Sequence, residues 1–254
     1  MDVPLDKDRH LRYLKRCLRS LLPYQYTSND SIRMTLGCFI IAAVDLLTPT
    51  TTAPPTAPLL TPSDRRLFRE WVLACQHPGG GFAGSPTHAL PAHEYESHGA
   101  GHGGDEAGSL GVANIAATFF ALQLLALLAE EQGSESAFAG VNRAATLSWL
   151  KRLQRGDGSF GEVLAQIPGR DGGGTRLISG GRDMRYCYLA AMIRWVLRGD
   201  VRPGQPGWVE DVDVGALVGH IRRSQTYDGG FSESSTHESH GASAGLPRLP
   251  ARHC

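Results

Sequence analysis

The sequence has no excess of charge of either sign, because 25 Lys and Arg residues balance 25 Asp and Glu residues. A neutral chain lacks the broad basic surface that attracts nucleic acids and anionic membranes, so neither is expected as a partner. Cysteine is also scarce: the five residues are odd in number, widely spaced, and form no C-x-x-C pair. That pattern argues against a disulfide framework and predicts reduced thiols in a cytoplasmic protein. The first residues, MDVPLDKDRHLRYLKR, are too charged for a secretory signal.

Long hydrophobic runs are equally rare, and one segment alone suggests a membrane span: SLGVANIAATFFALQLLALLAEE, at 109–131. Asn114, Thr118 and Gln123 interrupt it. A helix that is apolar nearly all round but carries a few polar groups is typical of the interior of a large helical domain. We therefore expect an inner helix here and no membrane span.

A repeated turn is the strongest feature that the sequence does contain. CQHPGGGFAG, LQRGDGSFGE and SQTYDGGFSE share one pattern, and in each a Gln precedes a Phe by six residues. The glycines suit a tight turn with positive φ after a helix, and the Phe can return to the core. Each copy therefore predicts a helix end, and the repeat as a whole predicts stacked helical units.

The segments between these turns have helical patterns. In each pair a more apolar helix precedes an amphipathic one that carries Arg or Lys, as expected when inner helices are packed on both sides and outer helices face water. No segment shows the alternation of a half-buried strand with hairpin turns, so the predicted fold class is all-α, an α/α barrel of helix pairs. The expected helices are at 9–22, 31–47, 64–76, 110–130, 138–154, 183–197 and 213–225.

Two internal segments are expected to lie outside the helices. The stretch TPTTTAPPTAPLLTP, at 48–62, is rich in Pro and Thr and predicts an exposed linker. The Gly-rich segment at 83–108 predicts a surface loop, because no helix or tight turn fixes the spacing of its metal-ligand side chains. Those side chains are His88, His93, His98, His102 and Asp105.

An ordered set of segments resembles the β subunit of protein geranylgeranyltransferase type I, up to about Gly241. The resemblance implies an α/α barrel whose cavity holds geranylgeranyl diphosphate, paired with a separate α subunit. It also implies transfer of a C20 isoprenoid to a cysteine in a C-terminal C-a-a-X motif, often ending in Leu. The segments are DRHLRYLKRCLRSLLPYQYTSNDSIRMTLGCFIIAAVDLL, NIAATFFAL, LQRGDGSFG, DMRYCYLAAMI and IRRSQTYDGGFSESSTHESHG.

The turn repeat by itself is less specific than the ordered set. Triterpene cyclases use a similar Q-x-x-D-G-S-aromatic repeat on related barrels, so a triterpene-cyclase-like barrel is an alternative. Protein farnesyltransferase, which transfers a C15 group, is another.

The resemblance also implies particular site residues. Arg185 and Tyr188 match the family's D-M-R-x-x-Y segment, in which the Arg lies near substrate and the Tyr lines the cavity; three apart on a helix, they share a face. Thr35 and Phe39 would line the far end of the isoprenoid. The farnesyl-transferring relatives place a Trp where Thr35 stands, which favours a C20 donor for this chain. His240 matches the histidine that hydrogen-bonds the diphosphate and is the expected catalytic residue.

From the residues alone, purely structural interpretations of these positions stay open. Arg185 could be a solvated charge, Thr35 a plain helix residue in the core, and His240 a surface residue after a turn.

The family pattern stops near residue 241. Relatives continue with further helices, a fourth glycine turn, and the zinc ligands Asp-x-Cys and His, whereas this chain reads ASAGLPRLPARHC. We therefore expect residues 1–241 to form a partial barrel, an open arc that lacks the C-terminal helices, and residues 242–254 to form a disordered tail. Zinc is expected for the family, but His253 and Cys254 do not reproduce the ligand spacing, so we expect no metal ligands in this chain.

The expected lack of zinc ligands puts the activity of the chain in doubt. The alternative function is a non-catalytic subunit that binds the α subunit without turnover.

Overall fold

The computed structural model describes most of the chain, and the structural statements below concern these residues alone. Most of the linker expected at 48–62, the loop from residue 88 onward, His240 and the tail at 242–254 lie outside them. The described residues are 5–20, 24–48, 60–87, 112–129, 136–168, 174–199, 201–233 and 236–239.

All the expected helices are present, with bounds within five residues of the predicted ones. A 3-10 helix, which the sequence did not indicate, precedes the second of them. The elements are α1 (Lys7–Arg19), η1 (Tyr24–Ile32), α2 (Arg33–Leu47), α3 (Pro62–Ala74), α4 (Ile115–Leu127), α5 (Arg143–Arg152), β1 (Val163–Pro168), β2 (Gly174–Ser179), α6 (Met184–Arg198) and α7 (Val214–Arg223).

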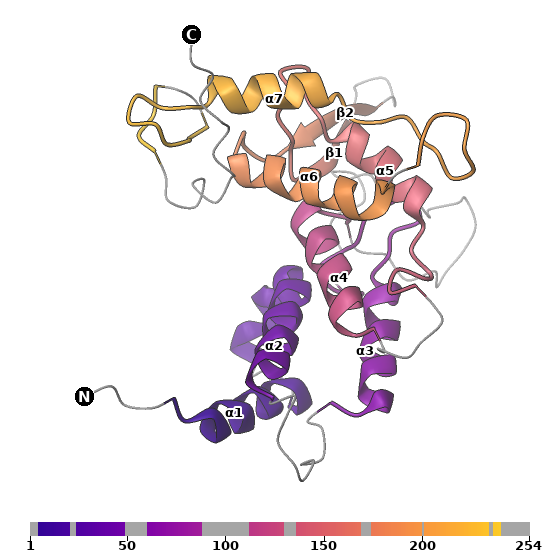
Figure 1. Ribbon diagram of the computed structural model, residues 1–254, viewed down its shortest axis with the longest axis vertical. Helices are drawn as coiled ribbons and strands as arrows, with labels where there is room; N and C mark the ends of the chain where they lie inside the picture. Colours follow the sequence, from indigo (N-terminus) through magenta and orange to yellow (C-terminus); the bar gives the residue numbers. More distant parts are fainter. Residues whose placement is uncertain are drawn as a thin grey trace.

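The helices form two layers of an open arc (Figure 1). The inner layer consists of α2, α4 and α6, with α4 packed between the other two. In the outer layer, α3 packs on α4, while α5 and α7 pack on α6. The first helices lie at one end of the arc and α7 at the other (Figure 1), which confirms the predicted all-α, partial toroid for the described residues. No helix among the described residues has both the length and the apolar character needed to cross a membrane.

The central position of α4 follows from its composition. Eight of its 13 residues are buried, including Ile115, Phe119 and Leu125. Burying a large apolar side chain contributes about 1.5–3 kcal/mol, so a helix that is apolar on nearly all sides is stable only with neighbours on several faces. The α4 side chains contribute to two core clusters, one shared with α2 and α3 and the other with α5, α6 and α7.

Asn and Asp residues cap the N-termini of five helices, the first of them Asp6 at the start of α1. Asn114, Asn142 and Asp213 each accept a hydrogen bond from the backbone N–H three residues on, at the starts of α4, α5 and α7. Asp183 accepts from the N–H of Arg185 at the start of α6. Each cap pairs one backbone donor that the helix leaves free, which typically contributes about 1 kcal/mol.

The three repeated turns have one geometry, as predicted. The Gln and the Phe of each copy form an isolated antiparallel bridge: Gln76 with Phe82, Gln154 with Phe160, and Gln225 with Phe231. Below we call these segments turn 1 (76–82), turn 2 (154–160) and turn 3 (225–231). The fifth residue of each turn is a glycine with positive φ. The turns therefore end the three outer helices α3, α5 and α7.

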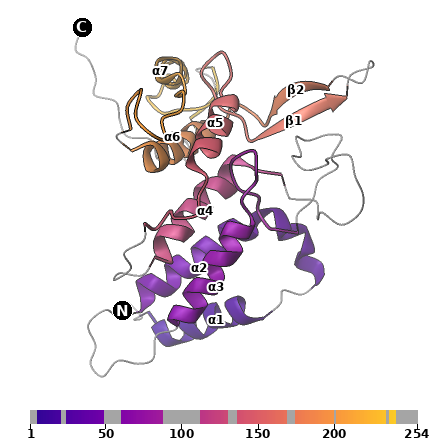
Figure 2. The same cartoon turned by 90° about the vertical axis from the view of Figure 1, so that its right-hand side faces the viewer.

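The expectation that the chain has no strands was wrong at one place. After turn 2, β1 and β2 pair as an antiparallel hairpin, from Val163 opposite Ser179 to Pro168 opposite Gly174. The hairpin projects away from the helices (Figure 2). Its sequence hides the alternation of a strand, because β1 begins with three consecutive apolar residues and the far end of the hairpin pairs a Pro with a Gly, both poor strand formers.

Candidate functional site

A row of aromatic side chains crosses the three inner helices. Phe39 of α2 contacts Phe120 of α4 edge-on with ring centroids 5.4 Å apart, and Phe120 contacts Phe119 at 5.2 Å. Phe119 in turn contacts Tyr188 of α6 at 5.7 Å. We call these four residues the aromatic row. The edge-to-face geometry is the one that aromatic quadrupoles favour, so the row adds to the packing between the inner helices.

Both ends of the aromatic row are accessible to solvent. Phe39 is 58% exposed and Tyr188 is 38% exposed, although each belongs to an inner helix. Trp195, 70% exposed, lies seven residues after Tyr188 and therefore on the same face of α6. Exposed large apolar side chains on helices of an inner layer often mark a surface that a ligand or another chain covers.

The structure brings two of the sequence-predicted residues, Phe39 and Tyr188, into this one row. Thr35 is half-buried and lies one helical turn before Phe39 in α2, so it stands at the α2 end of the row. Sequence reasoning did not single out Phe119 and Phe120, which connect the two ends. Both lie in the quoted segment NIAATFFAL, but a helix that is apolar on all sides does not reveal which of its side chains face a site.

Arg185 lies at the opposite end of the row, three residues before Tyr188 in α6. Its guanidinium donates to the carboxylate of Asp183 from Nε at 2.8 Å and from Nη2 at 2.5 Å. These hydrogen bonds and the carboxylate charge raise the pKa of Arg185, so the side chain is cationic at all ordinary pH. With 64% of its side chain exposed, Arg185 can still meet an anion, but it shares its charge with Asp183.

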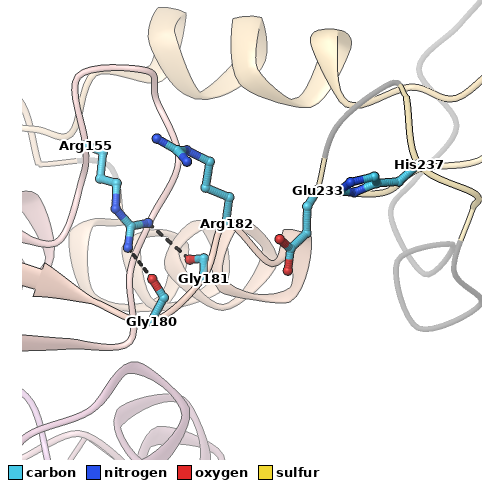
Figure 3. Close-up of a pocket in the computed structure, with 6 residues that line it drawn as sticks. All are labelled: Arg155, Gly180, Gly181, Arg182, Glu233 and His237. Carbon is cyan, nitrogen blue, oxygen red and sulfur yellow. Dashed lines mark hydrogen bonds between the residues drawn. The ribbon is translucent and has the colours of Figure 1, made fainter.

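A polar cavity of about 310 Å³ lies just before α6 (Figure 3). Its lining is Arg155, Gly180, Gly181, Arg182, Glu233 and His237. The side chains of Glu233 and His237 approach the cavity from the segment after turn 3, opposite the two arginines (Figure 3). The cavity therefore mixes positive and negative groups and does not form a purely cationic pocket.

The two arginines of the cavity are already engaged. Arg155 donates to the carbonyl oxygens of Phe160 at 2.8 Å and Gly180 at 2.6 Å, and it anchors the hairpin to turn 2. Burial and the neighbouring Arg182 lower the pKa of Arg155, which is consistent with a structural guanidinium. Arg182 donates to the carboxylate of Asp157 at 2.7 Å. Each arginine would have to rearrange to bind a strong anion.

His240, the expected catalytic residue, lies outside the described residues. Its neighbour Ser239 lies beside turn 3, where its hydroxyl donates to Asp228. His237, which the sequence left without a role, lines the polar cavity.

The described residues do not fit a zinc site. No three His, Cys, Asp or Glu side chains in this part of the chain are grouped to hold a metal ion. Burial raises the pKa of Cys38 to about 11, of Cys75 to about 12 and of Cys187 to about 11, so none of them readily supplies a thiolate ligand. His253 and Cys254 lie outside the described residues.

Comparisons with known proteins agree with the repeat and with the helical arc. The model of the prenyltransferase alpha-alpha toroid domain matches residues 5–245. The β subunit of geranylgeranyl transferase type 1 from Arabidopsis thaliana is 28% identical over 244 residues, which are 93% of this chain and 53% of that protein. The β subunit of protein farnesyltransferase from Pyricularia oryzae is 25% identical over 245 residues, 94% of this chain and 38% of that protein.

A solved structure has the same fold. The chain matches Candida albicans protein geranylgeranyltransferase-I complexed with GGPP with a TM-score of 0.65 and 19% identity, covering 95% of this chain and 57% of that one. At this identity the likeness shows the fold alone. The chain spans about half the length of the first of these relatives and less of the second.

Proposed function

Because the chain belongs to the prenyltransferase alpha-alpha toroid family, we propose that it acts as the β subunit of a protein geranylgeranyltransferase of type I. In this proposal it transfers a C20 isoprenoid from geranylgeranyl diphosphate to the cysteine of a C-terminal C-a-a-X motif, often ending in Leu. Its partner is a prenyltransferase α subunit, with which it forms a cytoplasmic heterodimer. The similarity to the Arabidopsis β subunit of that name supports the proposal, and the fold shared with the Candida geranylgeranyltransferase-I complexed with GGPP agrees with it.

The aromatic row is the observation that carries the proposal. An isoprenoid is a long apolar chain, and Phe39, Phe120 and Tyr188 are apolar side chains on three neighbouring helices that the buried Phe119 connects. A cation suits the diphosphate at one end of such a ligand, and Arg185 lies beside Tyr188. The half-buried Thr35 lies at the other end, where a small side chain leaves room for the fourth isoprene unit.

The reaction forms a bond between the cysteine sulfur and C1 of the isoprenoid and breaks the bond between C1 and the diphosphate oxygen. The leaving diphosphate gains negative charge, which nearby cations stabilise. In this chain we assign that role to Arg185 and, following the resemblance, to His240. In the family, a zinc ion turns the acceptor thiol into a thiolate; the described residues do not fit that ion, so we derive no step through it.

The donor preference can be tested by calorimetric titration of the full chain with geranylgeranyl and farnesyl diphosphates. We expect the C20 compound to bind, and Thr35→Trp to weaken its binding about tenfold or more while leaving the C15 compound little changed. Asp45→Trp is the matched control, because Asp45 is exposed on another face of the same helix. Equal effects of Thr35→Trp on both donors would contradict the assignment of Thr35.

A second assay separates catalysis from binding without turnover. The chain is co-expressed with a prenyltransferase α subunit, and both co-purification and transfer to a cysteine peptide ending in Leu are measured. An enzyme must do both, whereas a non-catalytic subunit co-purifies without transfer. Transfer of a C15 group in preference to C20 would support the farnesyl alternative.

A further inference from the structure

A buried histidine lies in α7, the helix that packs on turn 2. His220 is only 5% exposed, and its Nε2 atom has no hydrogen-bond partner in the part of the chain that the structure describes. Buried polar atoms are nearly always paired in folded proteins. An imidazole nitrogen in this position is therefore unusual, and the groups around it decide whether the ring can carry a charge.

The contact between α7 and turn 2, which we call the α7 joint, is made by backbone and side chains together. The side chain of Gln154 makes two hydrogen bonds to the N-cap of α7. Arg223 donates from Nη2 to the carbonyl of Asp157 at 2.8 Å. A Cβ on Gly158 would lie 2.0 Å from the carbonyl oxygen of Ala216, so the two backbones are in close contact.

His220 lies on the face of α7 that contacts turn 2. It stands four residues after Ala216 and three before Arg223, and residues three or four apart share one face of a helix. Since Ala216 and Arg223 both contact turn 2, the imidazole is enclosed at the α7 joint.

Cations outnumber anions around His220. Its charged neighbours are Asp157 and Arg155 from turn 2, Arg182 from the segment before α6, and Arg223 from α7 itself. Arg155 and Arg182 lie close together (Figure 3). The carboxylate of Asp157 already accepts from Arg182 at 2.7 Å, so it is shared with a guanidinium. A proton on His220 would add positive charge to a site with three arginines and one carboxylate.

The helix α6, which also packs on α7, contributes paired or neutral groups. Arg194 and Arg198 both bind the carboxylate of Asp211. Tyr186 and Cys187 lie near the arginines of turn 2, but burial raises their pKa values to about 12 and about 11, so both side chains are neutral near pH 6. These groups therefore do not offset a positive charge on the imidazole.

The protonation of His220 is coupled to the α7 joint. Burial lowers the pKa of His220 below its ordinary value, Asp157 opposes the shift, and the three arginines add to it. An imidazole in solvent has a pKa of about 6.5. Because the folded pKa is the lower one, the neutral ring stabilises the joint above about pH 6.5, and this contribution is lost as the pH falls toward the folded pKa.

We propose that the α7 joint is an acid-sensitive switch: uptake of a proton by His220 releases α7 from turn 2, while α4 and the inner layer stay folded. The charged ring is solvated only when α7 has separated from the turn, so the proton acts as a ligand of the open form. The proposal concerns the outer helix layer and is independent of any prenyl transfer.

The test is amide hydrogen exchange of the full chain, followed by NMR between pH 7 and pH 5 and corrected for the intrinsic pH dependence of exchange. The opening constant of α7 amides should rise by up to about tenfold for each pH unit between 6.5 and the folded pKa of His220. Amides of α4 should show no such rise. His220→Gln keeps a polar side chain that takes up no proton, and it should abolish the rise in α7.

Two further variants separate His220 from its surroundings. His237→Gln is the matched control, because His237 lines the polar cavity with Arg155 and Arg182 but is exposed; the rise should persist in this variant. Arg182→Gln removes a neighbouring cation, so the pKa of His220 should move toward 6.5 and the rise in α7 should become smaller.

NMR titration of the His220 ring in the unaltered chain provides a readout that needs no variant. We expect the ring to titrate below pH 6.5. A ring that titrates at 6.5 or above while α7 stays protected would overturn the proposal, as would a rise in α7 exchange that persists in His220→Gln. An equal rise in α4 would also overturn it, because acid would then unfold the whole protein and not one joint.

Discussion

Turn 2 and turn 3 have the same pattern and the same backbone closure, yet they differ in what surrounds them. Phe160 is fully buried, whereas Phe231 is only partly buried. A Cβ on Gly158 would meet the start of α7, whereas a Cβ on Gly229 would meet none of the described residues within 4 Å. Gln154 makes two hydrogen bonds to α7, whereas the Gln225 side chain makes none within the described residues.

The comparison separates the local folding of the motif from its contribution to the stability of the whole protein. Its local sequence fixes the turn, because a positive-φ glycine and short-range hydrogen bonds act in every copy. Its contribution to stability depends on a neighbour that the motif does not encode. The same substitution in the two turns therefore measures the neighbour's contribution.

The largest contrast is expected for the phenylalanines. Phe160→Ala should lower the free energy of unfolding by about 3–5 kcal/mol, because it leaves a cavity in the core. Phe231→Ala should cost about half as much or less, since part of its ring is already in water. Urea denaturation of both variants measures the difference. Equal costs would show that turn 3 is as well packed as turn 2.

The glycines should give the next largest contrast. Gly158 has φ +89° and Gly229 has φ +81°, so alanine is strained by a similar amount at either position, about 1–2 kcal/mol. Gly158→Ala also forces its Cβ against the carbonyl of Ala216, which adds about 1–3 kcal/mol. Gly229→Ala should therefore be clearly the milder variant when both are unfolded with urea. A smaller loss for Gly158→Ala would mean that α7 does not rest on turn 2.

A smaller contrast is expected for the glutamines. Gln154→Ala removes two hydrogen bonds to Asp213 and should cost about 1–2 kcal/mol. Gln225→Ala should change the free energy of unfolding by about 0.5 kcal/mol or less, as is usual for an exposed side chain without contacts.

The smallest effect is expected on the loss of stability at low pH. Burial raises the pKa of Asp157, but hydrogen bonds from Ser159 and from Arg182 lower it more, so it stands well below its ordinary value. The lowered pKa stabilises the folded state above the unfolded value of about 3.9, and this contribution is lost as the pH falls through the folded pKa. The melting temperature of the unaltered protein should therefore fall as the pH is lowered from 5 into the acid range, and Asp157→Asn should make this fall smaller. The difference should be about 2 °C or less, because the carboxylate is partly exposed.

Asp228 is the matched position in turn 3 for the acid experiment. Hydroxyl donors, first Ser239 and then Thr226, lower its pKa to about 2, and no cation is among the causes. Added salt should therefore reduce the effect of Asp157→Asn, which removes a partner of Arg182, and leave that of Asp228→Asn unchanged. The same salt response in both variants would contradict the ion pair in turn 2.

Much of this fold could be predicted from the sequence because its signals are local. The repeated turns predicted where the outer helices end, and the pattern of apolar residues predicted the inner helices. The β1–β2 hairpin could not be predicted, because Arg155 holds it through backbone carbonyls that no pattern records. The sequence also did not reveal that Gln76 and Gln154 accept hydrogen bonds from the N-caps of α5 and α7, since these partners lie more than 50 residues away in the chain.

The candidate site was predictable in part for the same reason. Phe39 and Tyr188 were identified through a resemblance, and the structure places them in one row. Phe119 and Phe120 join that row only through the packing of α4 between its neighbours, which periodicity cannot show in a helix that is apolar all round. Whether His240 belongs to the site stays a prediction.

The hydrogen bonds of Gln76 to the start of α5 and of Gln154 to the start of α7 connect each repeat to the next one, which makes the folding of the protein close to one-dimensional. In such an array, stability is a sum of the units and of their nearest-neighbour interfaces, and opening begins at the ends. Among the described residues, α4 is packed between α2 and α6, whereas α7 packs chiefly on α6. Amide hydrogen exchange should accordingly be slowest in α4 and faster in α7, which is packed against fewer of the described helices.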